Sequence, residues 1–579
     1  MTIIIGMVLM IFVATATAVA VSGTRKSSHD ADWSAAIAAA YAGVDDYQSR
    51  LSNDTSYSRY GNPHAAFSST STLVLPAQEN PAFGIGTTGT WASVPGSSNG
   101  AQYRYEVDNS SYATAGSLRI RSSGRVGDSV RSIVVNVKQK GFVDYLYYTD
   151  FEMTDPILRP NSWCPLTYAH QLPGNTHASG CQNIQFAAND VINGPFHSKD
   201  TVLTCGATRF NGTFTTENRI APLYKRSTAS GCSGSPVFAV APKHSDAPKM
   251  PESNAEMLRE TRGDLMSSTV PRPGCLYSGP TIITFTADGM MNVKSPFTRA
   301  TRTSGSPASG AVVNTDCGTP GNQTGQLGSL DGATIPVIDQ NLIYVQNVPN
   351  QAGNPNIPIS TTASNFTCSS SGNQWTFGTE KHPAANEQVP YASPAHYGCR
   401  NGDLYVKGVL DGRVTLAAQN YIYVTGDLTY ESASDDVLGL VGENSVWVHK
   451  PVYCSVWNKD EYGRNTTCRT YANISTTKDR RIDAAILSVL HTFIVQNYDR
   501  GASFGTLTVM GSIAQKFRGP VATTDGAGGV QSGYLKNYSY DPRFKYLAPP
   551  KFLSPATTTY GVSEIVEVKS AFKPDGSPA

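Results

Sequence analysis

The sequence predicts a mainly β protein with an N-terminal α-helix, in which the helix and an antiparallel sheet precede a parallel β-helix (a solenoid) with insertions. Three observations support this fold class. Residues 1–23 are apolar and uncharged, and a stretch with helical periodicity follows them. Short β-branched segments then recur between glycines, most regularly over residues 401–449. The 52 glycines and 35 prolines mark frequent turns, which favours many short strands.

Residues 1–24 are predicted to form a transmembrane helix, which makes the lipid bilayer a partner of the chain. No charge precedes Arg25 and Lys26, and about 20 apolar residues suffice to span a bilayer. A cleaved signal peptide is the main alternative, with Ala18-Val19-Ala20 as its small-residue site. A retained anchor is favoured because no positive segment precedes the apolar run, and a buried core helix is disfavoured by its length. The two basic residues tend to stay cytoplasmic, whereas the cysteines argue for an extracytoplasmic body.

Residues 25–55 are predicted to form an amphipathic helix that continues this stalk. Its apolar side chains recur at helical spacing: Trp33, Ile37, Tyr41, Val44 and Leu51. Residues 85–156 are predicted to form an antiparallel sheet that packs one face on the helix. Its three strands are expected at 103–107, 118–121 and 131–137, where polar and β-branched residues alternate. The aromatic and acidic stretch 141–156 is expected to be a connector packed against this sheet.

Residues 180–550 are predicted to form the β-helix-like region, with insertions near 237–330 and 345–400. Short strands separated by Gly-containing turns recur about every ten residues, and one further strand pair is expected around 281–293. A β-sandwich has the same signature, but strands of three to five residues without long hairpins favour the β-helix. Residues 551–579 are expected to be a loose C-terminal tail. The expected strands are 404–406, 414–418, 421–424, 437–441, 446–448, 484–487, 493–495, 507–509 and 512–514.

The charge balance and the cysteines restrict the class of protein. Lys and Arg number 45 against 44 Asp and Glu, so no overall basic field attracts nucleic acid. No Cys-x-x-Cys pair is present, which disfavours zinc, and an even cysteine number suggests up to five disulfides in an oxidising compartment. Sequential pairing is expected, with Cys454–Cys468 the most local pair, although the sequence leaves connectivity and free thiols open. The candidate disulfide cysteines are Cys164, Cys181, Cys205, Cys232, Cys275, Cys317, Cys368, Cys399, Cys454 and Cys468.

A half-apolar, half-amphipathic N-terminal helix followed by an antiparallel sheet resembles the plan of type IV pilins. Met1-Thr2-Ile3-Ile4-Ile5 is similar to the start of a mature pilin, commonly Phe-Thr-Leu-Ile-Glu. The chain also resembles the bacterial PilX-type pilus-assembly family. The stretches that carry this resemblance are GMVLMIFVATATAVAVSG, DWSAAIAAAYAGVDDYQSRL, GRVGDSVRSIVVNVKQKGFVDYLYYTDFE, NGPFHSKD, QNYIYVTGDLTY and GTLTVMGSIAQKFRGPV.

The resemblance implies a structural role in a filament, with other pilin subunits or pilus assembly proteins as partners. Ile5 stands where major pilins have a Glu that pairs with a neighbouring subunit, and no charged leader precedes Met1. Both departures favour a minor, tip or accessory component. The expected location is the cell membrane, single-pass, with the bulk of the chain extracytoplasmic or incorporated into a pilus.

One short motif is similar to the nucleophile loop of chymotrypsin-like proteases. Residues 231–236 read Gly-Cys-Ser-Gly-Ser-Pro, where the protease loop reads Gly-Asp-Ser-Gly-Gly-Pro. A serine nucleophile needs a histidine base and an orienting carboxylate. The chain offers His170 or His177 before the motif, with Asp190 and Asp200 between. The separation of about sixty residues is too short for the two-barrel protease fold, so a disulfide-bearing turn is the favoured interpretation.

No other pattern predicts an enzyme, a metal site or a cofactor. The ten histidines show no His-Glu-x-x-His spacing, and His449 and His491 are expected to be structural. Acids beside turns in a β-helix groove could bind calcium or cleave polysaccharide, but Asp beside Gly is first a turn residue. These acids are Asp403, Asp411, Asp427, Asp435 and Asp436. A set of basic and aromatic residues near the C-terminus could contact carbohydrate or another subunit, or could form a solvated face. The set comprises Lys516, Arg518, Lys536, Arg543, Lys545, Phe517, Tyr534, Tyr538 and Tyr546.

The sequence therefore predicts a membrane-anchored, extracytoplasmic, non-enzymatic protein that acts as a minor or accessory pilin-like component. The alternative is a cell-surface β-helix protein that binds or degrades polysaccharide. It requires acids and stacking aromatics gathered on one groove. A third possibility is a secreted protein without a filament role, which cleavage near Ala20 would produce.

Overall fold

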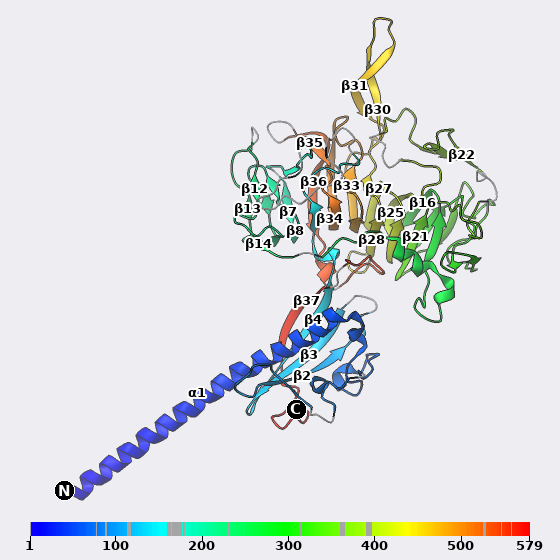
Figure 1. Cartoon of the computed structure of the whole chain (residues 1–579). Helices are drawn as coiled ribbons and strands as arrows, with labels where there is room; N and C mark the ends of the chain where they lie inside the picture. The colour runs from blue at the N-terminus through cyan, green and yellow to red at the C-terminus, as the bar shows by residue number, and fades with distance from the viewer. Residues whose placement is uncertain are drawn as a thin grey trace. The chain divides into compact units, whose positions relative to one another are not determined.

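In a computed structural model, the chain forms two compact units. Unit 1 comprises residues 1–140 and 558–579, and unit 2 comprises residues 141–557. Strands dominate unit 2, whereas unit 1 combines a sheet with the one long α-helix that begins the chain (Figure 1). The structure describes residues 2–579 except 77, 87–89, 113–116, 159–163, 165–176, 178–179, 189, 229–231, 247, 313, 359–364, 390–395, 525–528, 546 and 557–558.

Unit 1 consists of the helix α1 (Thr2–Asn53) and an antiparallel five-stranded sheet in the order β1-β2-β3-β4-β37. The expected three-stranded meander is confirmed as β2, β3 and β4. Its alternating β-branched and polar residues place one face of the sheet against the C-terminal half of α1. The strands are β1 (Ala92–Ser93), β2 (Gln102–Asp108), β3 (Ser117–Val126), β4 (Ser129–Lys140) and β37 (Thr559–Val568), and the short 3-10 helices are η1 (Thr55–Arg59), η2 (Ala66–Ser68) and η3 (Pro81–Phe83).

Two boundaries differ from the sequence-based prediction. Residues 551–579 are not a loose tail, because β37 pairs with β4 and carries the ion pair Arg131–Glu567. Residues 141–156 are not a connector on the sheet, because they contain β5 (Tyr147–Phe151), which belongs to unit 2. In both cases one pairing partner, β4 for β37 and β34 for β5, lies hundreds of residues away, so the local pattern does not reveal it.

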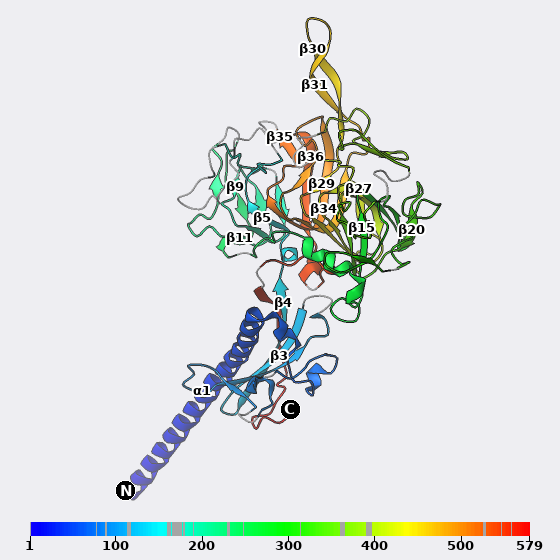
Figure 2. The same cartoon turned by 45° about the vertical axis from the view of Figure 1, so that its right-hand side comes forward.

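Unit 2 is built on ladders of short parallel strands (Figures 1 and 2). The longest ladder runs β15 (Cys275–Ser278), β21 (Asn341–Gln346), β26 (Arg413–Ala418), β28 (Val437–Gly442), β32 (Arg480–Ser488), β34 (Ser503–Phe517), β5, β8 (Phe196–Ser198), β11 (Phe214–Thr216) and β14 (Lys243–His244). A second runs β16 (Thr281–Thr286), β25 (Leu404–Leu410), β27 (Ile422–Tyr430), β29 (Val446–Val448) and β33 (Phe493–Val495).

Further parallel pairs complete the sides of unit 2. β34 pairs with β36 (Val530–Tyr540), followed by β7 (Val191–Asn193), β10 (Arg209–Phe210) and β13 (Val237–Phe238). A separate parallel set comprises β6 (Gln185–Phe186), β9 (Leu203–Thr204) and β12 (Lys225–Arg226). Each strand expected between 404 and 514 is present, and 507–509 and 512–514 merge into β34.

The register of the longest ladder stacks apolar side chains from equivalent positions of successive strands on one another. One such stack runs without interruption through the interior of unit 2, and its members are all buried. Continuous stacking is what a parallel ladder provides when each rung supplies an apolar residue at the same position. The stack consists of Ile343, Leu416, Leu440, Ile486, Ile513, Tyr147, Phe196 and Phe214.

The order of strands along this ladder is not their order along the chain. β34, the last strand of the ladder in chain order, lies beside β5, the first, with Ile513 opposite Tyr147. From β5 the chain proceeds to one end of the ladder at β14, and the next ladder strand, β15, lies at the other end. Within the segment between them lie the 3-10 helices η5 (Ala255–Thr261) and η6 (Gly263–Leu265).

Other segments of unit 2 lie outside the parallel ladders. They include parts of the insertions expected near 237–330 and 345–400. Within the first of these ranges, however, residues 237–244 and 275–286 contain strands that belong to the ladders. The segments are the antiparallel strands β17 (Met290–Lys294), β20 (Ala333–Pro336), β18 (Thr303–Ser304), β19 (Gly310–Ala311), β22 (Phe366–Cys368), β23 (Trp375–Phe377), β24 (Glu380–His382), β30 (Val452–Lys459), β31 (Asn465–Asn473) and β35 (Ala522–Thr524), with the 3-10 helices η4 (Phe142–Asp144) and η7 (Pro542–Lys545).

The ten cysteines form five disulfides, and the expected sequential pairing is confirmed. The pairs are Cys164–Cys181, Cys205–Cys232, Cys275–Cys317, Cys368–Cys399 and Cys454–Cys468. The last pair braces the hairpin β30–β31, whose two strands are largely exposed. A hairpin of this kind is only marginally stable by itself in water. The disulfide stabilises it, because the crosslink lowers the conformational entropy of the unfolded chain.

Candidate functional site

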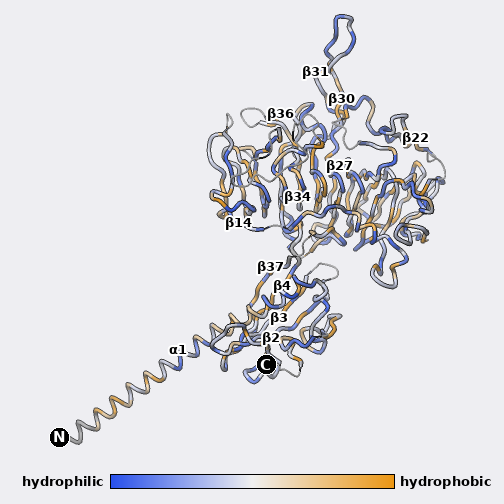
Figure 3. The backbone as a smooth tube through the Cα atoms, in the orientation of Figure 1, coloured by the Kyte–Doolittle hydropathy of each residue, from blue (hydrophilic) through white to orange (hydrophobic). Residues whose placement is uncertain are grey.

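The N-terminal half of α1 exposes a continuous set of apolar side chains. Phe12 is 71% exposed and Met10 is 77% exposed, although both are large hydrophobic residues. Hydrophobic colours recur along this half of the helix (Figure 3). Among the described residues, no helix has both the length and the mean hydropathy of a membrane span. The exposed apolar residues are Met7, Leu9, Met10, Ile11, Phe12, Val13, Val19 and Val21.

The C-terminal half of α1 is instead docked on the sheet of unit 1. Ala40, Val44 and Tyr47 are buried against β2, β3 and β4. Gly124 on β3 allows this close approach, because a Cβ there would lie 2.1 Å from the carbonyl oxygen of Ala36. One helix therefore has a docked half and a half that exposes apolar surface.

Gly124→Ala is expected to weaken the docking of α1. The added methyl group would meet helix backbone, which cannot move aside as a flexible side chain does, so we expect a loss of about 3 kcal/mol from overpacking. Thermal melting of the full chain measures this as an earlier transition of unit 1. Gly23→Ala is the matched control, because a Cβ at Gly23 meets nothing within 4 Å. An unchanged melting curve for Gly124→Ala would show that the helix is not packed as closely as described.

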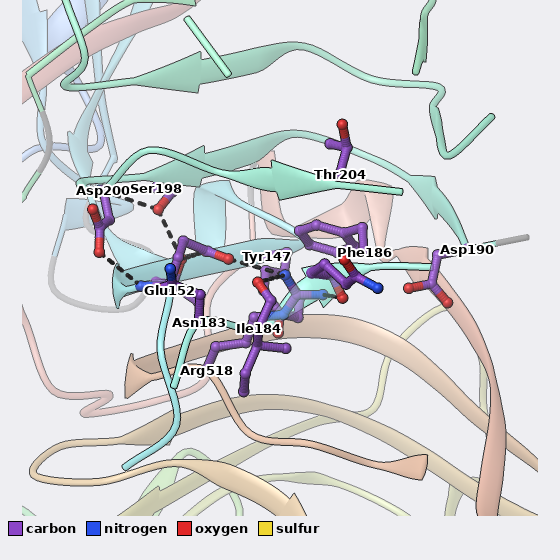
Figure 4. A network of polar contacts seen from close by, with 12 residues as sticks. Tyr147, Glu152, Asn183, Ile184, Phe186, Asp190, Ser198, Asp200, Thr204 and Arg518 are labelled. Carbon is purple, nitrogen blue, oxygen red and sulfur yellow. Dashed lines mark hydrogen bonds and ion pairs between the residues drawn. The ribbon is translucent and has the colours of Figure 1, made fainter. Parts of the chain in front are cut away.

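A second notable site in unit 2 is a buried polar network where β34 joins β5 (Figure 4). Arg518 directly follows β34, and its Nη1 donates to Glu152 Oε2 at 3.0 Å. Its guanidinium carbon lies 3.4 Å from the centre of the Phe186 ring. Arg518 and Glu152 are each 1% exposed. The ion pair thus joins two parts of the chain that are 366 residues apart.

The Glu152 end of the network is completed by hydroxyl and carboxylate groups. Thr149 Oγ1 donates to Glu152 Oε1, and the Glu152 backbone N–H donates to Asp200 Oδ2 at 3.0 Å. Nearby, Lys536 Nζ lies 2.8 Å from Asp190 Oδ2. Burial lowers the pKa of Lys536, while Asp190 opposes this shift. The charges are paired with one another, which is typical of a structural junction.

Asp200 also holds His177, one of the two histidines considered for a protease-like site. His177 Nε2 lies 2.6 Å from Asp200 Oδ2, and its Nδ1 contacts Asn183 Oδ1. Burial lowers the pKa of His177, but the bond to Asp200, the Asp200 charge and the bond to Asn183 together outweigh burial, and the net shift of the pKa is upward. With both ring nitrogens bonded in this way, neither is free to activate a serine.

The protease-like motif itself has the features of a disulfide-bearing turn. Cys232 is bonded to Cys205, and Ser235 accepts a hydrogen bond from Arg226. None of the contacts described for the chain joins His177 to Ser233. His170 and Gly231 lie outside the described residues.

The acids singled out in the sequence each have a separate local role. Asp436 accepts the backbone N–H groups of Gly412 and Ser432, Asp427 pairs with Arg480, and Asp435 contacts Arg413. Asp411 is exposed, and Asp403 is fully buried. Burial raises the pKa of the Asp403 carboxyl to about 8. Asp403 is therefore not part of an exposed acidic groove of the kind that polysaccharide cleavage would require.

The remaining predicted residues are mostly structural. His491 Nδ1 lies 2.6 Å from Asp155 Oδ2, and His449 is buried, which lowers its pKa to about 4. The basic and aromatic C-terminal set does not form one surface. Arg518, Tyr534 and Tyr538 are buried, Arg543 pairs with Asp541, and Tyr546 lies outside the described residues. Groups of three or more potential metal ligands are absent from the described residues.

Comparison with known proteins finds weak similarity to a pilin among the solved structures. No model of a known protein family and no curated protein matches the chain. Among solved structures, the competence-associated pilin ComZ from Thermus thermophilus is similar over 93% of this chain and 97% of its own, with 11% identity and a TM-score of 0.26. A similarity this weak decides nothing about function, which has to follow from the helix, sheet and ladders of this chain. The resemblance to PilX-type proteins stays a prediction.

Proposed function

We propose that this protein is a membrane-anchored, extracytoplasmic structural protein, a minor or accessory pilin-like component of a type IV pilus or related filament. The observation that carries the proposal is the division of α1 into an exposed apolar half and a docked half. Apolar surface is removed from water at a gain of roughly 25 cal/mol per Å². The exposed half of α1 therefore favours burial in a bilayer or among similar helices in a filament core.

Unit 2 fits the outward part of such a component. Its stacked parallel ladders and apolar interior support a parallel β-helix, a fold with long lateral surfaces for binding partners. The five disulfides favour an oxidising, extracytoplasmic compartment. The buried charges are paired, which favours a structural role over an enzymatic one.

The experiment compares two double variants of the full chain expressed in bacterial cells. Ile11→Asp/Val13→Asp places two carboxylates in the exposed apolar half, and each costs about 3 kcal/mol in a bilayer core. We expect the unmodified chain in the membrane or pilus fraction, with its first residue at or near Met1. We expect the double variant in the soluble fraction, with unit 2 still folded.

Ser28→Asp/Ser34→Asp is the matched control, because it adds the same charge to exposed positions of the same helix beyond the predicted transmembrane segment 1–24. It should fractionate like the unmodified chain. The proposal fails if the unmodified chain is soluble, if its N-terminus lies near Val21, or if both double variants fractionate alike. Co-purification with pilin subunits would support a filament role over simple anchoring.

A further inference from the structure

The parallel ladders of unit 2 are left open at one end. β12, β13 and β14 each pair with a single strand among the described residues, namely β9, β10 and β11. We call the opposite side of these three strands the basic edge. Repeat folds normally cover a terminal rung, since open strand edges invite pairing with other chains. The basic edge is therefore a candidate interaction surface.

The backbone of the basic edge presents hydrogen-bonding groups outward. Val237 and Ala239 donate their N–H groups inward to Thr208 and Phe210. In a parallel ladder the residue between two such donors directs its N–H and C=O to the other side, which places those of Phe238 on the open side. The same alternation applies to Arg226 between Lys225 and Ser227, whose N–H groups bond inward to Val202 and Thr204.

An aromatic stack also ends at this edge. The Phe238 ring stacks on Phe210 at 5.2 Å and contacts Phe214 at 5.0 Å, so it is the last rung of an interior phenylalanine column. Phe238 is only partly buried. Ile220 is 60% exposed, Val237 is 46% exposed and Val240 is 40% exposed. A further rung that supplied an apolar side chain would continue the column over Phe238.

The charges near this edge favour an acidic occupant over a second copy of the chain. Two copies that met edge to edge would oppose basic groups to basic groups. The other end of the ladders is covered, because β17 pairs with β16 and the Leu276 N–H bonds to Thr301. Residues 209–246 contain the bases Arg209, Arg219, Lys225, Arg226 and Lys243 and the acids Glu217 and Asp246.

We propose that the basic edge binds an extended acidic segment of a partner protein, which adds as a further strand and places an apolar side chain over Phe238. Main-chain hydrogen bonds supply affinity in this mode of recognition, and side-chain pockets and charges supply specificity. Unit 2 has this edge whether or not α1 anchors the chain, so the proposal does not rest on the proposed function.

The test uses two synthetic fluorescent peptides and the full chain. The first, Asp-Glu-Val-Phe-Val-Glu-Asp, can form a strand, and the second, Asp-Glu-Pro-Phe-Pro-Glu-Asp, has the same charge but lacks two amide donors. We expect saturable binding of the first peptide by fluorescence anisotropy and affinity about 10- to 30-fold weaker for the second. Hydrogen exchange should slow in segments 224–227, 237–239 and 243–245 when the first peptide binds.

Charge reversal tests the location of the site. Lys225→Glu/Arg226→Glu/Lys243→Glu should weaken binding of the first peptide by at least about tenfold. Lys459→Glu/Arg469→Glu/Lys478→Glu makes the same charge change at exposed positions elsewhere in unit 2 and should leave binding unchanged. Melting curves verify that both variants fold.

Four outcomes would overturn the proposal. The first peptide could fail to bind, or both peptides could bind with equal affinity. Both triple variants could lose the same amount of affinity for the first peptide. Finally, a 20-base-pair DNA duplex could bind without slowing hydrogen exchange in segments 224–227, 237–239 and 243–245. Equal peptide binding would indicate a surface for polyanions instead of a strand-pairing edge.

Discussion

Arg518→Met is expected to destabilise unit 2 by about 3–5 kcal/mol, because it leaves the carboxylate of Glu152 buried without its cation. Both residues are 1% exposed, and their charged groups are 3.0 Å apart. The variant also removes donors to the carbonyl groups of Ile184 and Gln185. Urea unfolding followed by the fluorescence of Trp375 and Trp447 measures the loss as a lower midpoint for unit 2.

Two further variants identify the cause of this loss. Arg518→Met/Glu152→Gln removes both charges and should recover a large part of the stability, because an uncharged pair has no desolvated ion. Arg464→Met breaks the exposed pair with Asp460 in the hairpin and should cost less than about 1 kcal/mol. If the double variant were as unstable as Arg518→Met, lost packing against Phe186 would explain the effect instead of the unpaired charge.

Asp403→Asn is expected to remove a strong pH dependence from the stability of unit 2. Burial raises the pKa of Asp403 to about 8, whereas an unfolded Asp titrates near pH 4. Between these values the folded state holds a proton that the unfolded state has released, so the free energy of unfolding falls as pH rises. From pH 4 to pH 8 the stability of the variant should gain about 5 kcal/mol relative to the unmodified chain.

The side chain of Asn resembles the protonated carboxyl group that the site favours. Asp403 Oδ1 accepts the Tyr421 N–H at 3.2 Å, a bond that an amide oxygen can also accept. The measurement is urea unfolding at half-unit steps from pH 4 to pH 8. Asp411→Asn removes a carboxylate from an exposed position of the same region and is the control. Parallel pH profiles for Asp403→Asn and the unmodified chain would contradict the prediction.

Local patterns predict much of the fold, and non-local pairings escape them. The strands between 404 and 448 are predictable because β-branched runs and glycines alternate within a few residues. The antiparallel β2–β4 sheet is predictable for the same reason. β37 is not, because its partner β4 is distant: Arg131 and Glu567 are 436 residues apart. No local signal predicts that β5, the first strand of the longest ladder in chain order, lies beside β34, the last one.

The same distinction applies to the sites. The apolar half of α1 follows from composition, whereas sequential pairing of the cysteines is only an expectation, because the sequence leaves their connectivity open. The Arg518–Glu152 pair joins residues 366 apart, and Glu152 by itself is one acid in an aromatic stretch. The basic edge depends on which strands have no outer neighbour. That information exists only after the ladders have formed.

The separation of β4 and β37 along the chain affects how the protein is made. All of unit 2 lies between these two neighbouring strands of one sheet. During synthesis from the N-terminus, β37 leaves the ribosome after every strand of unit 2. The sheet of unit 1 therefore acquires its final strand only after unit 2 has been translated, and any chain truncated before residue 559 retains an open edge at β4. An incomplete product thus differs from a finished one in the unit that contains α1.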